Sequence, residues 1–261
     1  MKIPTLSKKQ WLWMVITYII YGFVVGWPLA AAITFTIAFH EYCHLMMAAK
    51  LGMKTKGFTM IPFVGALAFV PEGYKTLWRQ AQVVFAGPIG GGLMAFITFG
   101  VCLWTGNPWF GAIAFWMGVM NLINLLPISF LDGGQLINTI TYSINRKIGL
   151  YLMCASTVIG AILIGYFSPI VGIFIWIFGL MHCLREYNNQ KYAALEMTWL
   201  CTPDFRNKPF PMNKKEISKV VIIWSASVLV LSLFCLFLHH SSYSNSSLLL
   251  DQMSNIPAGA R

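Results

Sequence analysis

Long apolar segments follow one another along this chain and leave no room for a soluble domain of ordinary size. Most have the roughly 17–25 residues that a helix needs to cross a bilayer. They are residues 11–27, 28–49, 81–104, 109–128, 148–167, 169–184 and 220–238. Because backbone N–H and C=O groups cannot stay unpaired in lipid, these segments are expected to form helices rather than strands. Segment 169–184 is short, so the sequence predicts an all-α polytopic membrane protein with six or seven transmembrane helices.

Composition and charge agree with this class. The chain is 57% hydrophobic and only 10% charged, which is typical of membrane proteins. Its net charge is +10, and if the N-terminus is cytoplasmic, seven crossings place every basic residue except Arg261 on the cytoplasmic side. This is the positive-inside pattern. The charge therefore indicates a multi-pass protein in contact with a lipid bilayer, in the cytoplasmic (inner) membrane if bacterial, and no nucleic-acid partner is expected.

The N-terminus also has features of a secretory signal peptide. Lys2, Lys8 and Lys9 precede an apolar run, and small residues follow at 30–32, as at a cleavage site. Cleavage there would cut into the segment that carries His40. The first apolar segment is therefore interpreted as a retained transmembrane helix.

Residues 40–44, His-Glu-Tyr-Cys-His, lie in the middle of the second apolar segment. Ionisable groups at membrane depth are costly and therefore indicate function. The spacing puts His40 and His44 on one face of a helix, one turn apart, where both imidazoles can bind one zinc ion. Glu41 is rotated from that face by about 100°, so it can act as general base on a metal-bound water without being a ligand. The alternative is a pair of histidines that only pack between helices.

Two histidines leave a catalytic zinc ion one protein ligand short, and Asp132 is the candidate for the third. It lies in the stretch NLLPISFLDGGQL, residues 124–136. Pro127 is expected to break or kink the fourth long helix. Gly133 and Gly134 let the backbone bend, so they can end a helix and turn the carboxylate inward. The alternative is an ordinary Asp-Gly turn at a helix end.

Together these motifs resemble the site-2 protease family of intramembrane zinc metalloproteases. The resemblance is carried by residues 40–44, by Asn124-Leu125-Leu126-Pro127 and by Leu131-Asp132-Gly133-Gly134. It implies that His40, His44 and Asp132 bind one Zn²⁺ ion and that Glu41 is the catalytic base. It also implies that Asn124 contacts substrate or stabilises the oxyanion.

The resemblance extends over about residues 30–140 and has one departure. Residues 85–90, Phe-Ala-Gly-Pro-Ile-Gly, start the third long helix and are similar to the family's Gly-Pro motif. The family's pattern continues with small residues and an asparagine, whereas this chain has glycines. The function implied is that of a zinc metalloendopeptidase in regulated intramembrane proteolysis, with a transmembrane protein as its substrate.

Residues 57–73 are apolar but are interrupted by glycines and prolines. This pattern excludes a spanning helix and predicts either a small membrane-associated β-hairpin or a re-entrant loop that only fills the fold. A hairpin would offer unpaired backbone groups to an extended substrate. Gly65, Ala66 and Leu67 are the candidate substrate-binding residues.

The predicted organisation has five parts. They are an N-terminal transmembrane helix (1–28), a zinc metalloprotease core (29–140), additional transmembrane helices (141–184), a basic cytoplasmic segment (185–219) and a last transmembrane helix with a tail (220–261). Two other functions fit the ligands: a catalytically inactive, protease-like membrane binding protein, or a metal transporter. A transporter usually has paired repeats, and no second segment like residues 40–44 is found.

Overall fold

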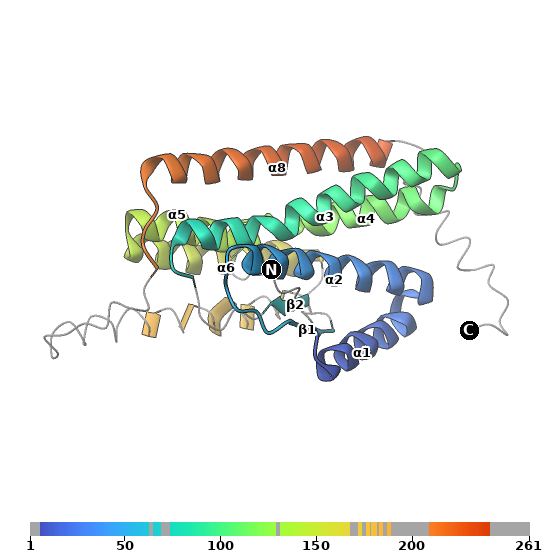
Figure 1. Cartoon of the computed structure of the whole chain (residues 1–261), viewed down its shortest axis with the longest axis horizontal. Coiled ribbons are helices and arrows are strands. Elements are labelled where there is room, and N and C mark those ends of the chain that lie inside the picture. The colour runs from blue at the N-terminus through green and yellow to red at the C-terminus, as the bar shows by residue number, and fades with distance from the viewer. Residues whose placement is uncertain are drawn as a thin grey trace, which may run out of the picture. The chain divides into compact units, whose positions relative to one another are not determined.

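The computed structural model describes residues 6–62, 65–68, 74–128, 131–167 and 209–240, with parts of 172–188 (172–173, 176–177, 179–181, 183–184 and 187–188). The described chain is mostly helical (Figure 1). Its helices are α1 (Lys8–Val25), α2 (Trp27–Lys50), α3 (Leu77–Thr105), α4 (Pro108–Asn124), α5 (Asp132–Ile144), α6 (Arg146–Phe167) and α8 (Lys214–His240). Its strands are β1 (Phe58–Ile61) and β2 (Gly65–Ala68).

Helices occupy each predicted apolar segment that the structure describes, so the helical prediction is confirmed there. Segment 169–184 lies largely outside the described residues. Among the described helices, α3 and α8 are long and apolar enough to cross a membrane. The number of crossings stays a prediction.

The chain forms two compact units. The first comprises Met1–Val70, Ala86–Ile123 and Ser225–Arg261, and the second comprises Pro71–Phe85 and Asn124–Trp224. In the first unit, α1 begins with a capping box in which Ser7 and Gln10 bond reciprocally, which satisfies two backbone donors that a helix start leaves unpaired. The Gln10 side chain also donates to the Lys56 carbonyl at 2.8 Å. The start of α1 is thereby tied to the chain that leads into β1.

The segment after α2 is a β-hairpin, not a re-entrant loop. β1 and β2 pair antiparallel, with Phe58 opposite Ala68 and Ile61 opposite Gly65, and they lie beside α1 and α2 (Figure 1). Phe58 and Met60 on β1 are buried against Leu45 of α2. Because Leu45 directly follows His44, this contact places the hairpin beside the histidine-bearing turn of α2.

Glycines in α3 let other helices of the first unit approach closely. A Cβ atom added at Gly90 would lie 3.1 Å from Cβ of Cys43 on α2, and one added at Gly92 would lie 3.0 Å from Leu231 on α8. Such close approach is typical of helix packing in membranes, where small residues line the interface. The Gly-Pro motif lies inside α3 rather than at its start, because the helix begins at Leu77, where the Thr76 hydroxyl accepts from the Arg79 N–H at 3.1 Å.

In the second unit, the break predicted near Pro127 is confirmed. Helix α4 ends at Asn124, since a residue that precedes proline avoids helical geometry. The prediction that Gly133 and Gly134 end a helix is wrong, because both lie in the first turn of α5. The reason is close packing: Gly133 lies against the carbonyl groups of Leu125 and Leu126. Only a residue without a side chain fits at position 133, so Gly133 allows a helix to start at Asp132 beside the preceding turn.

Further hydrogen bonds hold this turn and its surroundings. The indole N–H of Trp224 on α8 donates to the Leu125 carbonyl at 3.0 Å, which satisfies an acceptor that the end of α4 leaves unpaired. Phe210 bonds through its backbone to Lys75 and Leu77, just before and at the start of α3. The Met212 N–H donates to the Ser143 hydroxyl near the end of α5 at 2.9 Å. The chain is therefore anchored to α3 and α5 before α8 begins.

Replacing Gly133 by alanine should destabilise the second unit. The new Cβ would overlap two backbone carbonyls, which cannot move without shifting the turn before Asp132. We expect a loss of about 1–3 kcal/mol, the usual cost of overpacking, measured by thermal unfolding in detergent. The matched control is Gly100→Ala in α3, where an added Cβ meets nothing within 4 Å. Equal melting temperatures for the two variants would contradict this account of Gly133.

Candidate metal centre

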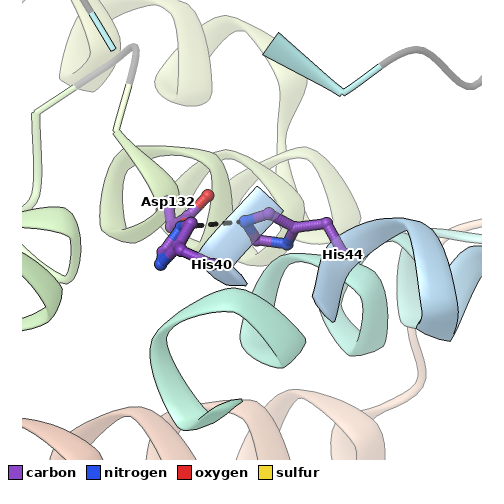
Figure 2. A group of neighbouring side chains, drawn as sticks. All are labelled: His40, His44 and Asp132. Atoms are coloured by element: carbon purple, nitrogen blue, oxygen red, sulfur yellow. Dashed lines mark hydrogen bonds between the residues drawn. The ribbon is translucent and has the colours of Figure 1, made fainter. Parts of the chain in front are cut away.

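Two buried histidines converge on α2. His40 and His44 are 5% and 7% exposed, and their Nε2 atoms lie 3.0 Å apart, joined by the dashed line in Figure 2. Two nitrogen ligands of one tetrahedral zinc ion, each about 2.0–2.1 Å from the metal, are separated by about 3.3 Å. The expected convergence of the two imidazoles is therefore found, at nearly the spacing that a shared ion requires.

Space for this convergence comes from Gly87 on α3. A Cβ atom added there would lie 2.6 Å from Nε2 of His40 and would overlap the His44 ring. Both imidazoles thus occupy the place that a side chain at position 87 would take. The Gly-Pro motif is therefore explained by contact with the histidines, which the sequence did not reveal.

His40 is held from its other side by Asn121 of α4, a residue that sequence analysis missed. Asn121 is 1% exposed. Its Oδ1 lies 2.9 Å from Nδ1 of His40, and its Nδ2 donates to the Met117 carbonyl at 2.7 Å. A sequence signal existed, because an asparagine inside an apolar helix needs a partner. The sequence alone did not say which partner.

Asp132 is the first residue of α5 and is 8% exposed. Its side chain is drawn in Figure 2 together with those of His40 and His44. Imidazole nitrogens and a carboxylate oxygen are usual zinc ligands. The residue types and their burial fit the group of ligands expected from the sequence.

The other predicted site residues have definite places. Glu41 is partly buried on α2 next to His40, and Asn124 is the partly buried last residue of α4. Gly65, Ala66 and Leu67 lie on β2, where they pair with Ile61, Met60 and Thr59. Their roles in catalysis and substrate binding stay predictions.

Comparison with known families agrees with the motifs. Residues 28–107 match the family described as peptidase family M50, the site-2 protease family. The match confirms the resemblance and indicates a metallopeptidase of the site-2 protease type, because members of this family are zinc metallopeptidases of membranes. The matched residues include His40, Glu41, His44 and Gly87, and they end before Asn124 and Asp132. No curated protein matches the chain.

Replacing Gly87 by alanine should impair metal binding. The added methyl group would push both imidazoles away from their shared position, and we expect zinc affinity to fall roughly tenfold or more, as when the groups that orient metal ligands are removed. The measurement is zinc competition against a chelator on protein purified in detergent. Gly100→Ala is the control, since it makes the same change in the same helix without a contact. Equal zinc affinity in the two variants would show that Gly87 does not govern the position of the histidines.

Proposed function

We propose that the protein is an intramembrane zinc metalloprotease, which hydrolyses peptide bonds within or near transmembrane segments of other membrane proteins. The observation that carries the proposal is the buried convergence of the His40 and His44 Nε2 atoms. It occurs within the stretch that matches peptidase family M50. Ionisable residues inside an apolar helix indicate function, which supports a ligand-binding role for the pair.

In this proposal His40, His44 and Asp132 hold one Zn²⁺ ion. Zinc, when bound, polarises a carbonyl group and lowers the pKa of water toward about 7. Glu41 takes a proton from the attacking water and later gives it to the leaving amine, because its position on α2 is rotated by about 100° from the ligand face. Asn124 donates a hydrogen bond to the peptide oxygen as that oxygen becomes negative.

The membrane arrangement is part of the same proposal. Six or seven helices cross the bilayer with the N-terminus in the cytoplasm, as the distribution of basic residues favours. His40 is about ten residues before Lys50, near the end of α2, and so lies about 15 Å below the cytoplasmic surface at 1.5 Å per residue. Water reaches the site from that side.

The substrate is a transmembrane protein whose helix unwinds at the cleavage site. A helix keeps its peptide groups inside its own hydrogen-bond ladder, so they must be released before they can be attacked. The two-stranded hairpin supports a route for this, since each of its strands pairs on one side only within the sheet. An extended substrate segment would pair with β2 at Gly65, Ala66 and Leu67, which offsets the loss of helical hydrogen bonds.

Glu41→Gln separates the protease from the other two candidate functions. We expect the variant to keep its zinc and to lose cleavage by at least about 10²-fold, because general-base catalysis typically contributes that much. The assay co-expresses the protein with candidate single-pass membrane proteins and follows which of them accumulates uncut. Glu216→Gln is the control, since it makes the same change at a carboxylate outside the proposed site, one that accepts from the Asn213 N–H at the start of α8.

Cleavage that persists in Glu41→Gln would refute the assigned role of Glu41. Metal transport by the parent protein with no cleavage of any partner would favour the transporter instead. Binding of a partner without cleavage by the parent would favour the inactive binding protein.

Asp132→Asn tests the third ligand. The amide keeps the shape of the carboxylate but removes its negative charge, so we expect zinc content well below one ion per protein and little cleavage. The decisive measurement is the melting temperature with and without a chelator, because a ligand that binds only the folded protein stabilises it. The parent should melt lower after zinc removal, and Asp132→Asn should not change. A chelator effect of parental size in the variant would place the third ligand elsewhere.

A further inference from the structure

A short chain of hydrogen bonds leads from the backbone of α4 to the metal-facing edge of His40. The Met117 carbonyl accepts from Nδ2 of Asn121 at 2.7 Å. Oδ1 of the same carboxamide lies 2.9 Å from Nδ1 of His40, and Nε2 of His40 lies 3.0 Å from Nε2 of His44. Each of these side chains is buried, so water does not compete for their polar atoms.

The backbone carbonyl decides the direction of every bond in this chain. A carbonyl oxygen only accepts, so the group that faces Met117 must be the amide nitrogen of Asn121. The amide oxygen then faces His40 and also only accepts, so Nδ1 of His40 must carry the hydrogen. A neutral imidazole holds one hydrogen, so Nε2 of His40 then presents its lone pair to Nε2 of His44, 3.0 Å away.

The carboxamide is also confined sterically. An added Cβ atom at Gly91 of α3 would lie 2.5 Å from Nδ2 and 2.6 Å from Cγ of Asn121. Position 91 must therefore be a glycine for Asn121 to stay where it is. With Met117 on one side and the α3 backbone on the other, the amide plane has little freedom to turn.

We infer that Asn121 is the positioning residue that holds His40 in the orientation and tautomer needed to bind a metal. It would act through His40 and would not itself touch the metal or the substrate. Residues that hydrogen-bond to a metal ligand raise the affinity of the site, because they hold the ligand in place before the metal arrives. The inference rests on the role of His40 in the proposed function, but not on proteolysis.

The test compares two substitutions of Asn121. Asn121→Leu removes both hydrogen bonds at similar volume, and we expect zinc affinity to fall roughly 10–100-fold, the usual effect of losing such a group. Asn121→Asp keeps an oxygen that accepts from Nδ1 of His40, so its zinc affinity should lie closer to that of the parent. Affinity is measured by chelator competition on full-length protein in detergent. The absorption spectrum of the Co²⁺-substituted protein reports the ligand geometry.

Asn138→Leu is the matched control. Asn138 is another buried asparagine, and its Nδ2 contacts the sulfur of Met153 instead of a histidine. It should lose stability without a change in zinc affinity or in the Co²⁺ spectrum. A purely structural role of Asn121 would make Asn121→Leu behave in the same way, and that result would overturn the inference.

Gly91→Ala provides a second route if Asn121→Leu does not fold. It leaves Asn121 in the chain but displaces its carboxamide, so zinc affinity should fall while Gly100→Ala keeps the parental value. Parental affinity in folded Gly91→Ala would overturn the inference. A parent protein that binds no zinc at all would instead refute the proposed function, so the two failures are distinguishable.

Discussion

The whole arrangement depends on placing two histidines inside an apolar helix without leaving their polar atoms unpaired. An unpaired polar group in such surroundings costs several kcal/mol, so each ring nitrogen needs a partner. His40 has Asn121 on one side and His44 on the other. Helix α4 must therefore lie close enough to α2 for a carboxamide to reach, and the sequence of α3 must leave space for the rings.

Helix α3 leaves that space through its glycines. Gly87 faces the two imidazoles, Gly90 faces Cys43 and Gly91 faces Asn121. The site-2 protease pattern has an asparagine after its Gly-Pro motif, and this chain has glycines instead. The carboxamide beside Gly91 comes from α4. In this chain an amide therefore contacts α3 as well, but Asn121 of α4 supplies it.

In the second unit, a helix break and close backbone packing together set the surroundings of Asp132. Pro127 ends one helix, and the turn that follows packs its carbonyls on Gly133, so a new helix starts with the carboxylate in its first turn. The first turn of a helix favours negative charge, because its N–H groups point toward it. Trp224 closes the same turn through the Leu125 carbonyl. The position of Asp132 is therefore a property of local packing in this unit.

The sequence by itself determined the helical segments and the pairing of His40 with His44, and it left a hairpin and a re-entrant loop as alternatives for residues 57–73. Each depends on local periodicity, on spacing within one element, or on glycine and proline. It also indicated Asp132 as a candidate ligand, through the resemblance and the need for a third ligand. Only the tertiary structure decided that Asn121, 81 residues away, is the partner of His40. It also decided that Gly87 and Gly91 leave space for the imidazoles and the carboxamide, and that Gly133 lies in the first turn of a helix. The physical reason is that a periodic pattern reports which residues share a face. Which polar atom that face meets is decided by how the helices pack.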